Sequence, residues 1–389
     1  MLKHLVIALT LLQTVAWSAP IYIVGSITEG LNSTPTLWIA QTTSLQSPPQ
    51  NIPLGSSSAT ASANAVVSVG NTIYCVGGQG ILNSATLWII DVPSTQTKNP
   101  SIITKSLSSN ESEALGIIPV GAQLFIVGYE KQSGSLKATL WITDTSGTSP
   151  QTITLSADES KGNSIAFYNG QVYIVGYTKD GSSTKPCLWI TNVNGSTPQQ
   201  IALDTTDNGE ASSILVIKNQ LYCLGYNAKQ NQAQVWITDL LGAHTKNYVL
   251  GPKNGFGYCF IKNGTGILNL VASSDPNLIP RIIPTSTSGM SFGEAPLYTP
   301  QSADSYIVGT SSMAQLTNNV YAVGYASLLD PSNLPGTNNA TLWKINLSIA
   351  TPYTIEKKNS IAVGIFIPQG SQLLPAAVKK QTTKYQIGI

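Results

Sequence analysis

Charged side chains are scarce in this 389-residue sequence, where Asp, Glu, Lys and Arg make up 10% of the chain against about 25% in ordinary soluble domains. Arginine occurs once, at Arg281, and the formal net charge is +2. Proteins that bind nucleic acid need a basic surface, and guanidinium groups are the strongest bidentate ligands of phosphate. The composition therefore predicts that the protein does not bind nucleic acid.

Histidine and cysteine are also rare. His244 is the only histidine beyond the first few residues, which leaves little from which to build a Ser-His-Asp or Cys-His nucleophilic site. The cysteines are Cys75, Cys187, Cys223 and Cys259. They stand in apolar runs without the paired spacing of zinc ligands, so we expect packing residues, with a bridge between Cys223 and Cys259 as the alternative. These absences favour a protein that is not an enzyme.

The beginning of the sequence has the features of a signal peptide. Lys3 precedes an apolar run that ends near Trp17 and is too short to span a bilayer. Ala16 and Ser18 are the small residues that a signal peptidase requires. We expect a signal peptide over residues 1–18, no membrane insertion after its removal, and a secreted, periplasmic or cell-surface protein. A retained anchor or a buried first strand is the alternative.

One phrase recurs through the rest of the chain: a short apolar strand that ends in Gly, a polar loop, and a second strand centred on Leu-Trp-Ile or a close variant. The clear copies are Ile21–Gly25 with Leu37–Ile39, Ile73–Gly77 with Leu87–Ile89, Leu124–Tyr129 with Leu140–Ile142, Val172–Tyr177 with Leu188–Ile190, Leu221–Tyr226 with Val235–Ile237, and Val320–Tyr325 with Leu342–Trp343. The aromatic anchors from Tyr22 to Tyr222 are 52, 51, 48 and 49 residues apart, and 99 residues separate Tyr222 from Tyr321. Ninety-nine residues are two periods, so we expect a degenerate copy near Ile267–Val271, without its Trp.

Repeats of this length, with four strands each, are typical of β-propeller blades. Two-residue turns such as Asn169-Gly170 indicate tight hairpins between the first two strands of a repeat. Near the C-terminus, Asn359–Val363 repeats Asn163–Phe167, and we expect it to complete the first blade. The sequence thus predicts an all-β, seven-bladed β-propeller of four-stranded antiparallel blades over residues 19–369, closed by a C-terminal strand, with a tail of unassigned role over 370–389.

The run Ile73–Gly78 resembles the second strand of a kelch repeat, and the pattern Gly-x-Val-Tyr-x-Val-Gly-Tyr at Gly170–Tyr177 is similar to other bacterial tandem propeller repeats. This resemblance covers most of residues 21–368. It implies a β-propeller fold and carries little information about function.

Propellers commonly bind ligands at one rim of the central channel, formed by the loop after the second strand and the loop between blades. Tyrosines follow the strand-ending Gly in four repeats, and carboxylates gather in the loops between repeats. Aromatic rings at such a rim can stack on sugars or peptides, or they can simply pack between blades. The predicted ligand-binding residues are Tyr129, Tyr177, Tyr226, Tyr325, Glu113, Glu159 and Glu210.

The segment Asp204–Glu210 collects oxygen ligands around a Gly turn, which is what a hard cation such as calcium needs. Asp204, Asp207 and Glu210 are therefore candidate ligands of a weak calcium site, with an ordinary polar turn as the alternative. No other cofactor is expected, and no feature indicates an oligomeric state.

The leading hypothesis is an exported binding module that recognises a glycan or a protein through the rim of its channel. One alternative is a carboxylate-based glycosidase or lyase at the channel mouth, because glycoside cleavage uses paired acids. A structural cell-surface protein is the other.

Overall fold

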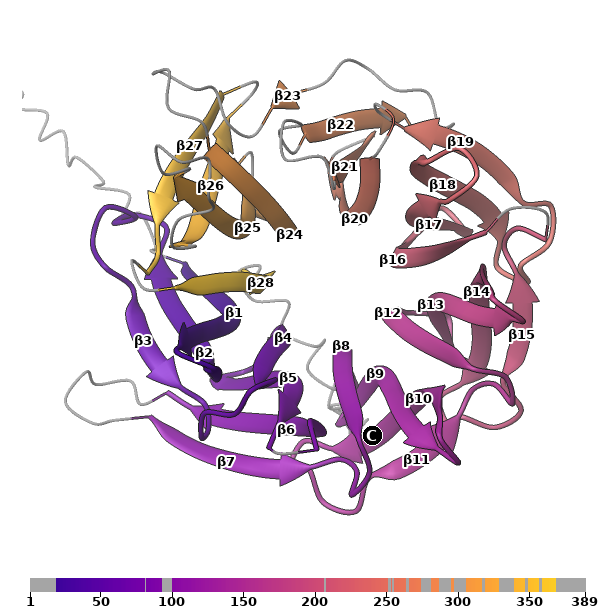
Figure 1. The fold of residues 1–389 in the computed structure, drawn as a ribbon, viewed down its shortest axis with the longest axis horizontal. Coiled ribbons are helices and arrows are strands. Elements are labelled where there is room, and N and C mark those ends of the chain that lie inside the picture. The colour runs from indigo at the N-terminus through magenta and orange to yellow at the C-terminus, as the bar shows by residue number, and fades with distance from the viewer. Residues whose placement is uncertain are drawn as a thin grey trace, which may run out of the picture.

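A computed structural model describes residues 19–80, 82–92, 100–205, 208–250, 253, 255–263, 266–273, 281–286, 295–296, 306–316, 319–328, 339–346, 349–356 and 359–368. These residues form 28 strands in seven antiparallel sheets, arranged radially around a central axis (Figure 1). In this part of the chain there is no helix long and apolar enough to cross a membrane. The fold is an all-β propeller.

We number the sheets as blades 1 to 7 and give their strands from the axis outward. Blade 1 contains β28 (Ser360–Phe366), β1 (Pro20–Glu29), β2 (Asn32–Gln41) and β3 (Gln50–Pro53). Blades 2 and 3 contain β4 (Ser62–Val69), β5 (Thr72–Gln79), β6 (Ser84–Asp91) and β7 (Ser101–Ser106), then β8 (Ser112–Val120), β9 (Gln123–Gln132), β10 (Ser135–Asp144) and β11 (Gln151–Thr154). Blades 4 and 5 contain β12 (Ser160–Tyr168), β13 (Gln171–Asp180), β14 (Ser183–Asn192) and β15 (Gln199–Ala202), then β16 (Gly209–Ile217), β17 (Gln220–Asn227), β18 (Gln232–Asp239) and β19 (Lys246–Leu250). Blades 6 and 7 contain β20 (Gly255–Asn263), β21 (Gly266–Ser273), β22 (Arg281–Ser286) and β23 (Ala295–Pro296), then β24 (Tyr306–Leu316), β25 (Asn319–Leu328), β26 (Asn339–Asn346) and β27 (Ile349–Thr354).

The prediction of a regular ring of seven four-stranded blades is wrong in one blade. Six of the described blades are complete, with outer strands of four to six residues. In blade 6 the outer strand β23 has two residues and pairs only with Arg281 and Ile282. Proline has no amide N–H to donate, so Pro284 in the third strand and Pro296 in the outer strand limit this pairing.

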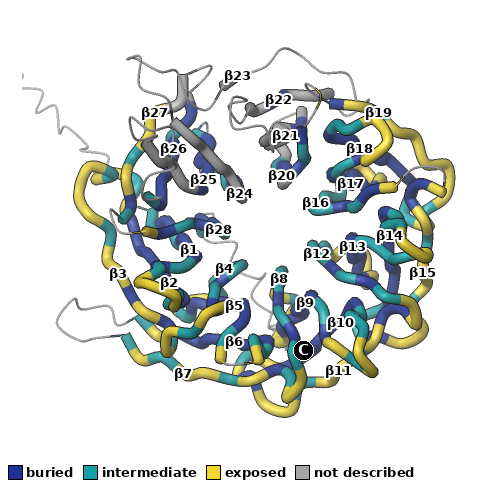
Figure 2. Tube along the Cα trace, viewed as in Figure 1, coloured by how far each residue is buried: buried dark blue, intermediate teal, exposed yellow. Residues whose placement is uncertain are grey.

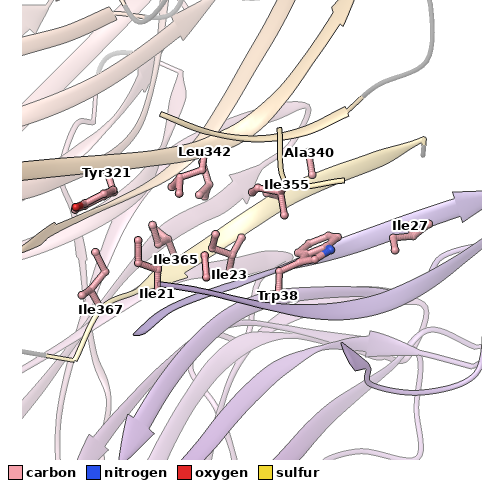
Figure 3. Packing of buried hydrophobic residues seen from close by; sticks show 13 residues of the cluster. Ile21, Ile23, Ile27, Trp38, Tyr321, Ala340, Leu342, Ile355, Ile365 and Ile367 are labelled. Atoms are coloured by element: carbon pink, nitrogen blue, oxygen red, sulfur yellow. The ribbon is translucent and has the colours of Figure 1, made fainter. Parts of the chain in front are cut away.

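The inner strand of blade 1 comes from the C-terminal part of the chain. β28 pairs antiparallel with β1 and also contacts β24 and β4 of the neighbouring blades. An apolar cluster at this junction includes Ile21 and Ile23 from β1, Tyr321 and Leu342 from blade 7, and Ile365 from β28 (Figure 3). Blades 7 and 1 therefore share one apolar core.

The Trp of the repeated phrase lies between neighbouring blades. The six side chains, at most 1% exposed, are Trp38, Trp88, Trp141, Trp189, Trp236 and Trp343. Trp141 of blade 3, for example, packs in a cluster with Tyr74 and Val76 of blade 2. Exposed residues gather on the outer strands and turns, away from these interfaces (Figure 2). One large buried side chain in nearly every blade explains why the Leu-Trp-Ile strand recurs.

A one-residue bulge interrupts the pairing of the inner and second strands in all seven blades. In blade 4 the bulged residue is Asn163, and Gly176 of the second strand faces Gly162. A Cβ atom on Gly176 would lie 1.8 Å from the carbonyl oxygen of Lys161, which real structures do not allow. The same close approach occurs at Gly25, Gly77, Gly128 and Gly225. The glycine that ends the repeated strand is thus a steric requirement of the bulge.

We predict that Gly176→Ala lowers the free energy of unfolding by at least about 2 kcal/mol, because the inner strand has to shift to make room. Gly170→Ala is the matched control, since Gly170 has φ +78° but open space around it, and it should cost about 1 kcal/mol of backbone strain. Chemical denaturation of both variants measures the difference. Equal stability of Gly176→Ala and the unsubstituted protein would contradict the steric explanation.

Candidate functional site

The central channel holds a cavity of about 400 Å³, and all seven inner strands contribute to its wall. Polar residues around it include Asn64, Asn163, Ser212 and Ser312, and Lys161 lies at the end where the inner strands begin. The channel therefore has a polar wall with a cationic group at one mouth.

Three successive blades place a charged residue of the inner strand opposite a tyrosine of the second strand at this mouth. The pairs are Glu113 with Tyr129 in blade 3, Lys161 with Tyr177 in blade 4, and Glu210 with Tyr226 in blade 5. We call these six residues the rim sector. In blade 2 the equivalent residues are Ser62 and Gly78, and in blade 1 they are Ile361 and Ser26, so neither of these blades carries a charged or aromatic group at this position.

Glu113 joins blades 2 and 3 through its own hydrogen bonds. Its carboxylate accepts from the Tyr129 hydroxyl at 3.0 Å and from Asn64 Nδ2 at 2.8 Å. The pKa of Tyr129 is raised, first by burial and then by the negative charge of Glu113. The Lys161 ammonium group lies 5.4 Å from the centre of the Tyr129 ring, within the range of a cation–π contact. Both the hydroxyl and one face of Tyr129 are therefore already engaged.

Tyr226 is engaged in a similar way. Its hydroxyl donates to Asn231 Oδ1 at 2.7 Å. Its ring stacks on Phe256 of blade 6, with the ring centres 4.1 Å apart. This residue is mainly a packing contact between blades 5 and 6.

Tyr177 and Glu210 are the members of the rim sector whose polar groups remain available. Both side chains are half-buried, and neither makes a hydrogen bond within the described part of the chain. Burial raises the pKa of Glu210, while the positive charge of Lys161 lowers it. Burial also raises the pKa of Tyr177, with smaller effects from Glu210 and Glu159. A carboxylate and a phenol hydroxyl thus stand partly desolvated beside the channel mouth, without a hydrogen bond to any described residue.

Glu159 and Tyr325 are the other two predicted ligand-binding residues. Glu159 forms an ion pair with Lys179 at 3.0 Å, and both side chains are about one-third exposed. Tyr325 lies on β25 opposite Gly309, and its side chain is outside the described residues.

The proposed calcium ligands are not assembled among the described residues. Asp204 is buried after β15, Glu210 belongs to the rim sector, and Asp207 lies outside the described residues. Where the chain is described, no three His, Cys, Asp or Glu side chains gather closely enough to hold a metal ion. The calcium site remains a prediction.

The alternative of a bridge between Cys223 and Cys259 is wrong, because all four cysteines are free. Cys223 packs in the core between blades 4 and 5, whereas Cys259 packs toward blade 7. Burial raises the thiol pKa of Cys187 and Cys259 to about 12, so neither is a reactive thiolate at neutral pH.

Sequence reasoning missed Lys161 and Phe256. Both occupy the repeat position of Glu113 and Glu210, immediately before the small residue that precedes the bulge. Alignment of the inner strands on that small residue would have found them.

We predict that Lys161→Gln raises the pKa of Glu210 further, because the variant removes the positive charge that now lowers it. The titration can be followed by carboxyl ¹³C NMR, with Glu210→Gln to assign the signal. Since the folded-state pKa lies above the unfolded value, stability falls as pH rises through the interval between the two, and Glu210→Gln should remove that loss. An unchanged or lower pKa of Glu210 in Lys161→Gln would show that the two groups do not interact.

No protein-family model and no curated protein sequence matches this chain. Among solved structures, that of YjhT is 11% identical, with 74% of this chain and 96% of that chain covered and a TM-score of 0.46. The β-propeller domain of the Trilobed protease from Pyrococcus furiosus, described as having an open velcro topology, is 11% identical, with 87% of this chain and 99% of that chain covered and a TM-score of 0.47. These similarities concern the fold alone, so the function has to be argued from the residues of the chain itself.

Proposed function

We propose that the protein is an exported, non-enzymatic β-propeller that recognises a glycan or protein ligand at the rim sector. The observation that carries the proposal is the pair Tyr177 and Glu210, half-buried and without hydrogen-bond partners among the described residues, at the mouth of the polar channel. Desolvated polar groups without partners are costly, and a ligand that bonds to them offsets that cost. The carboxylate suits a ligand that presents hydroxyl or amide donors.

The hydrogen bonds of the neighbouring acids support binding rather than hydrolysis. Glycosidases need two available carboxyl groups about 5–10 Å apart. Glu113 is held by Asn64 and Tyr129, and Glu159 is paired with Lys179. Glu210 is left as the one rim-sector acid without such a partner in the described part of the chain.

Export and a relation to kelch-like or other bacterial tandem-repeat propellers belong to the same proposal. Export is supported by the apolar leader with its small residues Ala16 and Ser18, and the kelch-like resemblance by the run Ile73–Gly78. A weak calcium requirement through Asp204, Asp207 and Glu210 is a further element, supported by the oxygen-rich composition of that segment.

The test is binding of the purified protein to a broad glycan array, with and without a calcium chelator. We expect Tyr177→Phe and Glu210→Gln each to weaken binding about five- to tenfold, because each variant loses one hydrogen bond to the ligand. The effect should be larger for Glu210→Gln, since its hydrogen bond involves a charged group. Tyr168→Phe is the control, because the Tyr168 hydroxyl donates to Asn219 at the other end of the inner strand. Loss of binding with the chelator would support the calcium element.

Three outcomes contradict parts of this proposal. Glycan binding that is unchanged in both rim variants would place the site elsewhere. If no glycan on the array binds, the ligand is not a glycan and a protein ligand is left. Cleavage of a bound oligosaccharide would show that the protein is a hydrolase and contradict a purely binding role.

A further inference from the structure

A second cavity, of about 390 Å³, lies between blades 4 and 5. It is bordered by the turn at Asn169, by the loop after β14 and by Leu240 and Leu241 of the loop after β18. β12 runs from Ser160 near the rim sector to Tyr168, so this cavity is at the other end of the blades. We call it the 4–5 pocket, and its size falls within the ~300–1,000 Å³ of ligand sites.

Tyr173 presents an unpartnered hydroxyl group to this pocket. The side chain is 1% exposed and lines the cavity, yet its hydroxyl makes no hydrogen bond within the described part of the chain. The equivalent Tyr222 in blade 5 donates to Gln220 at 3.2 Å. In blade 2 burial raises the pKa of Tyr74, and Thr145 of the next blade lies close enough to oppose that rise. Tyr173 has no such neighbour, and it shares the lack of a hydrogen bond within the described residues with Tyr22 and Tyr321, but it is the member of this set that lines the cavity.

The loop that faces Tyr173 also departs from its sister loops. Leu241 is 75% exposed, and its N–H donates to Asp239 Oδ1 at 2.9 Å. The equivalent turns in blades 3 and 4 form the same hydrogen bond. There the residue whose N–H donates is polar, Ser146 in blade 3 and Asn194 in blade 4. Because the turn forms equally well with polar residues, its geometry does not require an exposed leucine. Leu240 stands where blade 3 has Thr145, and it packs against the core cluster that contains Tyr173.

The remaining wall is neutral and rich in amides. Asn169, Gln171 and Gln199 line the pocket with side-chain amides that have no hydrogen-bond partner among the described residues. No described residue of the lining is charged. An amide both donates and accepts, as a sugar hydroxyl does, whereas an ionic ligand would find no counter-charge here.

We propose that the 4–5 pocket is a second binding site, independent of the rim sector, and that it takes a neutral carbohydrate. The Tyr173 hydroxyl and the amides of Asn169, Gln171 and Gln199 bond to the sugar hydroxyls. Leu241 covers the apolar face of the sugar ring. The neutral wall, the free phenol hydroxyl and the single exposed leucine all fit a ligand with many hydroxyl groups and no charge.

The test is saturation-transfer NMR on the full protein with neutral mono- and disaccharides of glucose, galactose, mannose and N-acetylglucosamine at millimolar concentration. For a saccharide that binds, we expect Tyr173→Phe to weaken the affinity about five- to tenfold. Leu241→Ser, which installs the residue of blade 3, should weaken it by a similar factor. The free energy of unfolding should stay unchanged in both variants, because neither side-chain group has an internal partner to lose.

Two controls separate this site from others. Tyr74→Phe removes the equivalent hydroxyl in another blade, away from the 4–5 pocket, and should leave saccharide binding unchanged. Tyr177→Phe reports on the rim sector and should have no effect on the 4–5 pocket. The proposal is overturned if no neutral saccharide gives a signal, if binding persists unchanged in Tyr173→Phe and Leu241→Ser, or if only Tyr177→Phe reduces it. It is also overturned if peptides bind in place of saccharides.

Discussion

The bulge in each inner strand is the backbone feature on which both the ring and its mouth depend. It bends the strand and offsets it by one residue, so that the bulged side chain turns toward the next blade. Asn64 and Asn163 occupy this position and donate to the backbone carbonyls of Ala114 and Ala211, each at 2.9 Å. The residue two positions before the bulge is the one that faces the second strand at the rim, as Lys161 faces Tyr177 in blade 4. One local distortion therefore links neighbouring blades and builds the rim sector.

The bulge also explains how far the fold follows from sequence. The recurring Gly and Trp predict strand positions because each satisfies a local requirement, a close backbone approach or a buried interface. Blade 6 keeps the bulge, but Val271 of its second strand stands opposite Gly257 of the inner strand. A Cβ atom on Gly257 would meet the Leu224 side chain of blade 5 at 2.5 Å, so this glycine serves the contact between blades. Pro284 and Pro296 then shorten the outer pairing, which no periodicity of apolar residues indicates.

The candidate site was less predictable because it depends on contacts between blades. Sequence placed tyrosines and carboxylates at one rim, but it could not show which of them are already satisfied. Tyr226 donates a hydrogen bond to Asn231 and stacks on Phe256. Glu113 accepts a hydrogen bond from Asn64. These partners come from loops and neighbouring repeats, so no spacing rule finds them.

Packing explains the residues that recur in every repeat, so the positions at which a blade differs from the others are the ones that indicate function. At the rim, the positions that hold Ser26 and Gly78 in blades 1 and 2 carry tyrosines in blades 3 to 5. At the other end, blade 5 replaces a polar turn residue with the exposed Leu241, and Leu240 stands where blade 3 has a threonine near Tyr74. Leu240, in place of that threonine, packs against the core cluster that contains Tyr173, whereas the exposed Leu241 is not part of that cluster. Since an exposed leucine and a phenol hydroxyl without a hydrogen-bond partner among the described residues both border the 4–5 pocket, a ligand that contacts both is the simplest physical reason for keeping them together.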